Sequence, residues 1–117
     1  RLVVKPLLPG FDSDWIVGEQ AALTERGSEI WFTLGNREQD DQRYDSALEA
    51  YRIALVLNPL NERAVIASMS LALDTQQRHV ALDLYERYRH DVAERLGIEP
   101  SSLVQALFKR ALDETRD

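Results

Sequence analysis

The segment RYDSALEAYRIALVLNPLNERA, residues 43 to 64, stops one helical pattern at a proline and starts another at once. Pro59 cannot continue a helix because it lacks the amide donor and its ring clashes with the preceding turn. Asn61 then offers a cap for a new helix after a connection of only about three residues. Two helices joined so closely must pack side by side, so the stretch predicts helical hairpins.

The apolar pattern of this segment returns later in the chain. A shift of 34 residues lays Ala47 on Ala81 and Tyr51 on Tyr85. A period of this length is typical of stacked helix pairs, in which each unit buries its apolar face against its neighbours. We therefore expect an all-α stack of helix pairs.

Capping and stop signals divide the chain into an arm and five helices. The opening RLVVKPLLPGF contains two prolines and a glycine, which exclude a regular helix, so residues 1–13 are expected to form an extended arm and residues 14–117 a helical repeat domain. Gly97 with Ile98 predicts a Schellman end, and Ser102 with Gln105 predicts a capping box. The expected helices are 14–37, 45–57, 62–74, 78–96 and one that begins near Ser102.

Three glycines interrupt the first helical pattern, at Gly18, Gly27 and Gly35. Each costs about 1 kcal/mol of helix propensity relative to alanine, so such residues need a structural reason. Either the helix breaks near Gly27, or the glycines let another helix approach closely. We favour close packing at Gly35.

The first repeat unit resembles a tetratricopeptide repeat, because eight residues fall at the spacing of that signature: Trp31, Leu34, Gly35, Tyr44, Ala47, Tyr51, Ala54 and Pro59. The resemblance implies a right-handed stack of antiparallel helix pairs with a C-terminal capping helix. Small residues would let the helices approach, while the aromatic residues fill the gaps. Ala81, Tyr85 and Gly97 mark the second unit. There Ser68 and Met69 replace leucine and glycine, so this unit should pack more loosely or end the array.

A second resemblance covers nearly the whole chain. The segments LLPGFDSDW, LNPLNERAV and ALDLYERYRHDVAERLGIEP are similar to the bacterial transcriptional activator domain, which accompanies a DNA-binding head in SARP-type regulators. The most specific parts are PLNER and YERYRHDVAERLGIEPS. The resemblance implies a non-catalytic, cytoplasmic regulatory module for self-association, partner contact or signal reception. A protein partner or a second copy would bind it, and DNA would be bound only through another domain.

The composition restricts the possible functions. A net charge of -6 without a basic cluster argues against direct binding of nucleic acid, because neutralisation of phosphates supplies most of that affinity. The absence of cysteine excludes disulfides, a thiolate nucleophile and cysteine zinc sites. No apolar run approaches the roughly 20 residues of a membrane span, so no membrane contact is expected. Because residue 1 is arginine, we expect the chain to be a piece of a longer protein.

Candidate chemical sites are weak. His79 and His90 share one expected helix, but eleven residues place them about 16 Å apart, too far to bind one metal ion. The acidic run EQDDQ, residues 38–42, lacks the alternating ligands and the glycine of a calcium loop. No nucleophile, base and orienting group occur together. We expect no enzyme activity, no cofactor and no metal.

Asn36 is the one candidate for a groove contact. It matches a position that holds peptide carboxylates in some tetratricopeptide proteins, but Phe32 and Ala67 stand where that clamp would need lysine and asparagine. Capture of a peptide carboxylate is therefore not expected as the main function. The alternative function is a general tetratricopeptide adaptor that binds a partner peptide in its groove, outside transcription. Two repeats are few for an independent array, so either the arm and last helix or a second copy should cover its ends.

Overall fold

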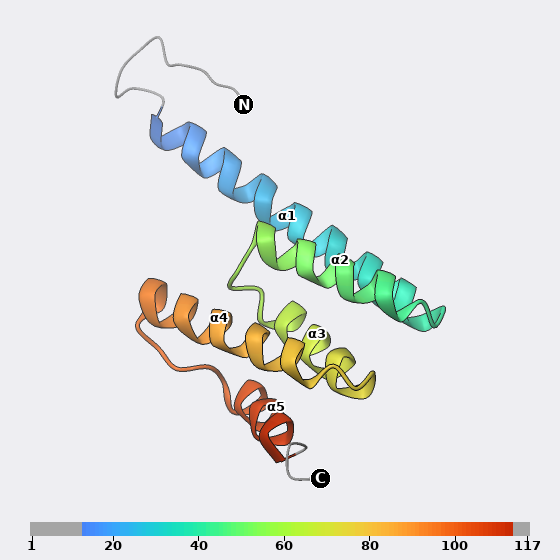
Figure 1. Cartoon of the computed structure of the whole chain (residues 1–117). Helices are drawn as coiled ribbons and strands as arrows, with labels where there is room; N and C mark the ends of the chain where they lie inside the picture. The colour runs from blue at the N-terminus through green and yellow to red at the C-terminus, as the bar shows by residue number, and fades with distance from the viewer. Residues whose placement is uncertain (1–12, 114–117) are drawn as a thin grey trace.

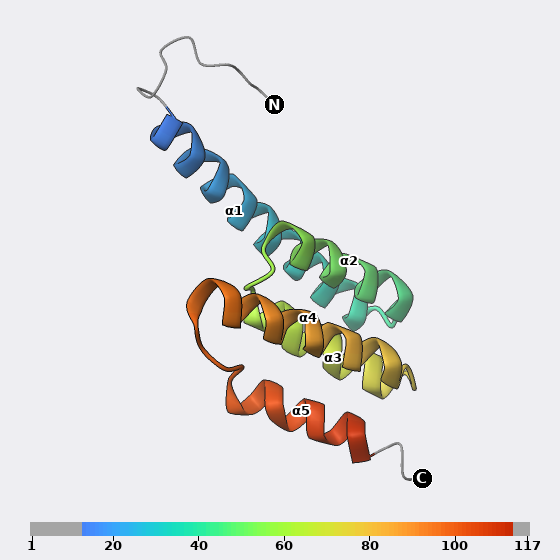
Figure 2. The same cartoon turned by 60° about the vertical axis from the view of Figure 1, so that its left-hand side comes forward.

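The computed structural model describes residues 13–113, with side chains from Ala22 onward, and all regular structure in that part is helical. Two antiparallel pairs, α1 with α2 and α3 with α4, stack side by side, and α5 packs against the second pair (Figures 1 and 2). The helices are α1 (Ser13–Asp40), α2 (Tyr44–Leu57), α3 (Glu62–Asp74), α4 (Arg78–Leu96) and α5 (Ser102–Asp113). The expected stack of helix pairs with a capping helix is confirmed. The arm predicted for residues 1–13 lies outside the described residues except for Ser13.

The first helix is longer than its partner. α1 has 28 residues and α2 has 14, so the first half of α1 extends past the end of α2 (Figure 1). α1 is continuous through Gly27 and ends three residues later than expected, at Asp40. The break considered near Gly27 does not occur.

Close packing at Gly35 joins the first pair. A Cβ atom added to Gly35 would lie 2.5 Å from a ring carbon of Tyr51, which is fully buried. The Tyr51 hydroxyl reaches the side of α1 and donates a hydrogen bond to Asn36 Oδ1 at 2.7 Å. Ala47 and Ala54 of α2 are also fully buried. The aromatic ring occupies the space that the missing side chain of Gly35 leaves open.

The second helix pair packs differently from the first at the position that corresponds to Gly35. Met69 stands where the first unit has Gly35, and it is fully buried together with Ser68. The Ser68 hydroxyl donates to the Ala64 carbonyl at 2.7 Å, which satisfies this buried polar group. Tyr85, the counterpart of Tyr51, stacks on Phe108 of α5 with ring centroids 4.0 Å apart. The substitutions at Ser68 and Met69 therefore fill the second unit, and α5 covers it.

The ends of α3 and α4 follow the predicted signals. Asn61 caps α3 by accepting a hydrogen bond from the Ala64 amide, and Gly97 ends α4 with φ at 66°. The Ile98 amide donates to the Val92 carbonyl at 3.4 Å, the long bond of a Schellman end. Ile98, however, is 53% exposed, so the apolar contact expected there buries only about half of this residue.

The predicted capping box at the start of α5 is wrong by one residue. Ser101, not Ser102, caps the helix, because its hydroxyl accepts from the Val104 amide at 3.4 Å. Gln105 does not close a box and instead donates to the Pro100 carbonyl at 2.7 Å. The Ser101 hydroxyl also donates to Glu62 of α3 at 2.6 Å, and this tertiary bond favours Ser101 at the cap.

The two glycines of α1 give a matched pair of substitutions. Gly35→Ala should lower the free energy of unfolding by about 1–2 kcal/mol, because the clash with the buried Tyr51 ring outweighs the gain in helix propensity. Gly27→Ala should be neutral or stabilising by up to about 1 kcal/mol, since its Cβ would meet only the tip of Leu57, at 3.2 Å. Urea unfolding of both variants measures the difference. Equal effects would contradict this account of the helix contact.

Candidate functional site

The joint between the two helix pairs is polar and buried. The Ser28 hydroxyl of α1 donates to the Ala54 carbonyl of α2 at 2.8 Å, and Ser28 is fully buried. The Asn61 amide donates to Ser28 Oγ at 2.9 Å and to Glu29 Oε2 at 3.0 Å. Because Asn61 also caps α3, these bonds tie α1, α2 and α3 together. Sequence reasoning identified Asn61 only as a cap, and no motif pointed to Ser28.

On the surface beside the buried hydrogen bonds, an ion pair and an aromatic contact also join α3 to α1. Arg63 of α3 pairs with Glu29 of α1 and lies 4.8 Å from the centroid of the Phe32 ring. An exposed ion pair is worth little by itself, but stacking on Phe32 adds a cation–π contribution. Phe32 in turn packs beside Tyr51, with ring centroids 5.9 Å apart. The start of α3 is thus held against α1 from two sides.

Glu62 connects the second pair to the capping helix. Its carboxylate accepts hydrogen bonds from the Ser101 hydroxyl, at 2.6 Å, and from the Tyr88 hydroxyl. Burial raises the pKa of Tyr88 above its ordinary value, and the charge of Glu62 and this hydrogen bond raise it further. The two most specific sequence segments, PLNER and YERYRHDVAERLGIEPS, therefore meet in space at Glu62. Apart from the presence of both segments, no sequence pattern predicted this contact.

A groove of about 530 Å³ lies between α2 and α4. Its apolar lining consists of Ile53, Leu55, Val56, Pro59, Val65, Val80, Leu84 and Tyr88. Charged side chains of both signs surround it, namely Glu49, Arg52, Asp83, Arg87 and Asp91. Val56 is 78% exposed at its edge, and Arg87 pairs with Asp83 at 3.3 Å. The α2–α4 groove can accept apolar side chains of a protein partner and has charges available around them.

Asn36, the predicted groove contact, supports the core. Its side-chain oxygen and that of Gln39 both lie within hydrogen-bonding distance of the Tyr51 hydroxyl, at 2.7 and 3.0 Å. A hydroxyl has one proton, so only one of these amides accepts it and the other must present its NH₂ group to the hydroxyl oxygen. Phe32 and Ala67 pack against the buried cluster of the first pair. Contact of Asn36 with a ligand stays a prediction.

Most of the predicted repeat positions lie inside the stack. Those that are buried are Gly35, Ala47, Tyr51, Ala54, Ala81 and Tyr85, while Trp31, Leu34 and Pro59 are half-buried. Gly97 is exposed at the end of α4. Tyr44 does not fill a gap between helices as expected, because it begins α2 at the hairpin and its side chain is 42% exposed.

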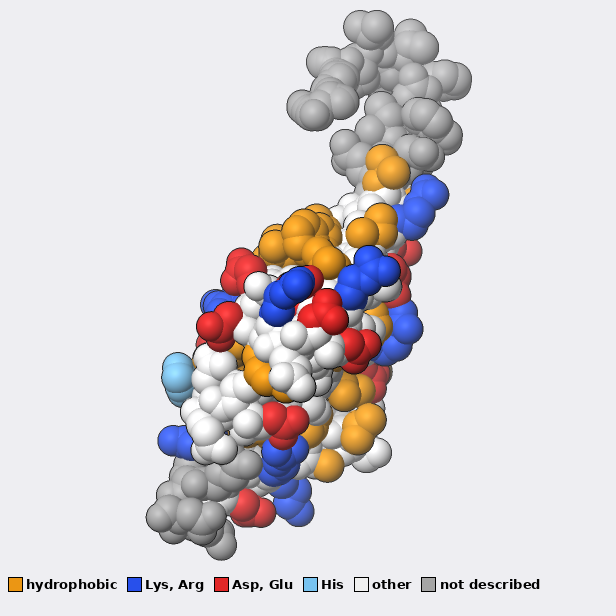
Figure 3. All heavy atoms as spheres, turned by 90° about the vertical axis from the view of Figure 1, so that its right-hand side faces the viewer, with side chains coloured by type: hydrophobic (Ala, Val, Ile, Leu, Met, Phe, Trp, Pro, Cys, Tyr) orange, Lys and Arg blue, Asp and Glu red, His pale blue; other side chains and the backbone are white. Residues whose placement is uncertain are grey.

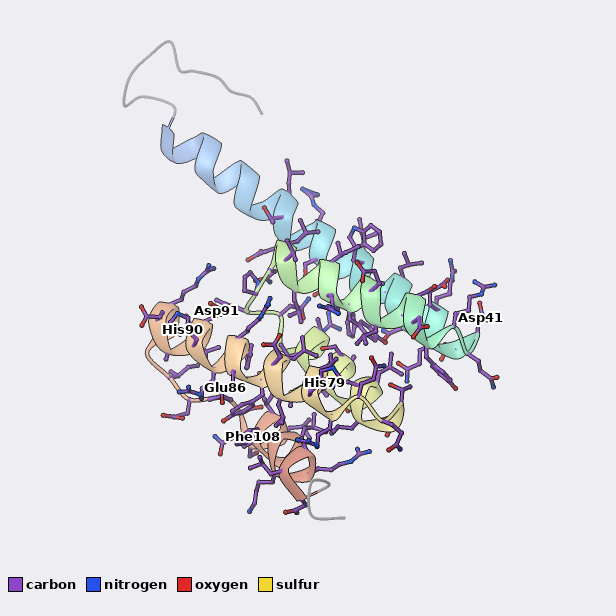
Figure 4. The ribbon with its side chains drawn as sticks, viewed as in Figure 1. Asp41, His79, Glu86, His90, Asp91 and Phe108 are labelled. Atoms are coloured by element: carbon purple, nitrogen blue, oxygen red, sulfur yellow. The ribbon has the colours of Figure 1, made fainter. Side chains whose placement is uncertain are left out.

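The weak candidates for chemistry stay apart. His79 and His90 lie near opposite ends of α4 (Figure 4), and residues 13–113 contain no group of three His, Cys, Asp or Glu that could hold a metal ion. In the acidic run at the α1–α2 hairpin, Glu38 pairs with Arg43 at 3.2 Å and Asp41 approaches it at 3.9 Å. No helix in the described part of the chain is long and apolar enough to cross a membrane.

Comparison with known proteins gives one match. A family model described as the bacterial transcriptional activator domain matches residues 5–112, nearly the whole chain. No curated protein and no solved structure matches.

The double role of Asn61 can be tested with Asn61→Asp. Aspartate caps helices as well as asparagine does, so a purely local cap would keep its stability. At the joint, the new carboxylate loses the donor to Ser28 and faces Glu29, so we expect a loss of about 1–3 kcal/mol in the free energy of unfolding. Urea denaturation at neutral pH measures it. Asn58→Asp, in the same loop, is the control, and similar stability of both variants would contradict a role beyond capping.

The raised pKa of Tyr88 predicts a loss of stability in alkali. The unfolded chain releases the tyrosine proton near pH 10 while the folded chain retains it, so stability is complete below pH 10 and falls as the pH rises toward the folded pKa. Tyr88→Phe should flatten this fall, although Tyr51, whose pKa is also raised by burial and by Asp40, keeps part of it. Urea unfolding at pH 8 and pH 11 checks the slope. A variant with the parent's slope would exclude Tyr88 as a source.

Proposed function

Because the chain belongs to the bacterial transcriptional activator domain family, we propose that it is a non-catalytic protein-contact module of a bacterial transcription regulator. The observation that carries the proposal is the family match over residues 5–112. The family is a regulatory one related to transcriptional activation. In this proposal the module works in the cytoplasm with a DNA-binding domain that lies outside these residues. It serves that domain by self-association, by contact with a partner protein or by reception of a signal.

The charge of the chain supports the assignment of DNA binding to a separate domain. The net charge of -6 repels the phosphate backbone, so the module is unsuited to hold DNA by itself. The ion pairs among the described residues place arginine beside a carboxylate, for example Arg89 with Glu86 at 2.9 Å and Arg110 with Asp74 at 2.8 Å. These arginines are already neutralised locally.

The α2–α4 groove supports a contact with protein. Its lining comes from both helix pairs, and the hydrogen bonds of Ser28 and Asn61 fix how those pairs meet. A preformed surface loses less entropy when it binds than a mobile one does. Apolar side chains between charges of both signs suit the polar rim and apolar centre of a protein interface.

A tethering experiment tests the proposed function. The chain is fused to an unrelated DNA-binding domain whose site lies upstream of a reporter promoter in a bacterial cell. We expect higher reporter output than with the DNA-binding domain alone, and a loss of that increase with Val56→Asp in the groove. His79→Ala, exposed on α4 and outside the groove, is the matched control.

A second measurement examines DNA directly. The purified chain should not retard duplex DNA in a gel at low salt, where electrostatic binding is strongest. Retardation by the chain alone, or a reporter that does not respond to the tethered chain, would contradict the proposed function.

A further inference from the structure

The outer face of α1 is a second apolar surface, separate from the α2–α4 groove. Ile30 is 66% exposed and Leu23, two turns earlier, is 55% exposed. A shallow hollow lies along this face and is lined by Arg26, Glu29, Ile30, Thr33, Leu34 and Arg37. Figure 3 shows hydrophobic side chains beside basic and acidic ones on the surface below the grey N-terminal segment. We call the six residues that line this hollow the α1 outer face.

The repeat register relates the α1 outer face to a face of α3 that is covered by another helix. A shift of 34 residues places Ile30 on Ala64, Leu34 on Ser68 and Arg37 on Leu71. These counterparts on α3 are all buried, with exposures of 0%, 0% and 2%. Leu71 packs in one cluster with Ala47, Leu48 and Tyr51 of α2. The face that α3 covers with a neighbouring helix is therefore the face that α1 leaves open.

The two ends of the stack differ in this respect. At the C-terminal end, α5 packs on α3 and α4, and Val104, Leu107 and Ala111 are buried there. At the other end, no helix among residues 13–113 covers the α1 outer face. An amphipathic helix of a partner would bury Ile30 and Leu34 there as α2 buries the face of α3.

The charges of the face restrict its partner. The carboxylate of Glu29 pairs with Arg63 and accepts a hydrogen bond from the Asn61 side-chain amide. Among the side chains that the structure describes, Arg26 and Arg37 have no carboxylate partner within ion-pair distance. They stand eleven residues apart, or about 16 Å along the helix, at the two ends of the hollow. A helix that covered them without carboxylates would bury two unpaired charges, at a high cost.

We propose that the α1 outer face binds an amphipathic helix of a partner protein, in the position that α2 takes on α3. The apolar side of that helix covers Ile30 and Leu34, and its carboxylates pair with Arg26 and Arg37. The α1 outer face and the α2–α4 groove are different surfaces, so this inference goes beyond the proposed function. It can be wrong while the proposed function is right.

A peptide of residues 43–60 serves as the probe, since it contains the helix that covers the equivalent face of α3. A hydrocarbon staple between positions 49 and 53, which line the side of α2 toward α4, holds it helical. A second peptide has Leu48→Glu, because Leu48 lies in the same buried cluster as Leu71, the counterpart of Arg37. Fluorescence anisotropy with the full chain measures both affinities.

Both peptides should bind, and the Leu48→Glu peptide should bind about threefold to tenfold more tightly because of its contact with Arg37. Ile30→Asp in the chain should weaken binding by at least about tenfold, and Arg37→Glu should abolish the advantage of the Leu48→Glu peptide. Val56→Asp, exposed at the α2–α4 groove, is the matched control and should leave both affinities unchanged. Circular dichroism verifies that each variant is folded.

Three results would overturn the proposal. The first is no saturable binding of either peptide, and the second is binding that Val56→Asp reduces while Ile30→Asp does not. The third comes from sedimentation velocity of the purified chain: a dimer that Ile30→Asp dissociates would assign the face to a second copy. The reporter experiment responds to the groove and not to this face, so the two proposals fail separately.

Discussion

The rest of the structure depends on the amide side chain of Asn61. Its oxygen accepts a hydrogen bond from the Ala64 amide in the first turn of α3, and its nitrogen donates to Ser28 and Glu29 of α1. A serine or aspartate could serve as the cap but could not donate two further hydrogen bonds in this way. Both ends of the group are needed, since Ser28 is fully buried. One residue thus fixes where the second pair begins and how it sits on the first.

The positions of Glu62 and Arg63 follow from this start. They are the first residues of α3, and their side chains point in different directions. Arg63 reaches Phe32, whereas Glu62 reaches Tyr88 and Ser101. The segment PLNER therefore combines a turn, a cap and two tertiary contacts in five residues. This density of contacts explains in physical terms why the segment is more specific than the general repeat pattern.

Local chemistry made the helices predictable. Pro59, Asn61 and Gly97 set helix ends through their own backbone and side-chain properties, and the structure has the ends there. Close packing at Gly35 was predictable because a glycine inside a helical pattern needs a structural reason, and the tetratricopeptide resemblance implies that aromatic residues fill the space beside such small residues. The hydrogen bonds of Glu62 were not predictable, since they depend on which turns of α3, α4 and α5 face one another. The misplaced cap at Ser102 and the exposed ring of Tyr44 have the same origin, because tertiary contacts select among neighbouring residues that are locally equivalent.

The α2–α4 groove takes its two walls from different helix pairs, so its width depends on how those pairs are joined. The hydrogen bonds of Asn61 and the packing of Leu71 in one buried cluster with α2 hold that joint at several points. Residues that never touch a bound partner, such as Ser28, therefore set the distance between the two walls. The selection of side chains that fit the groove is in this way encoded in the buried joint as well as in the lining.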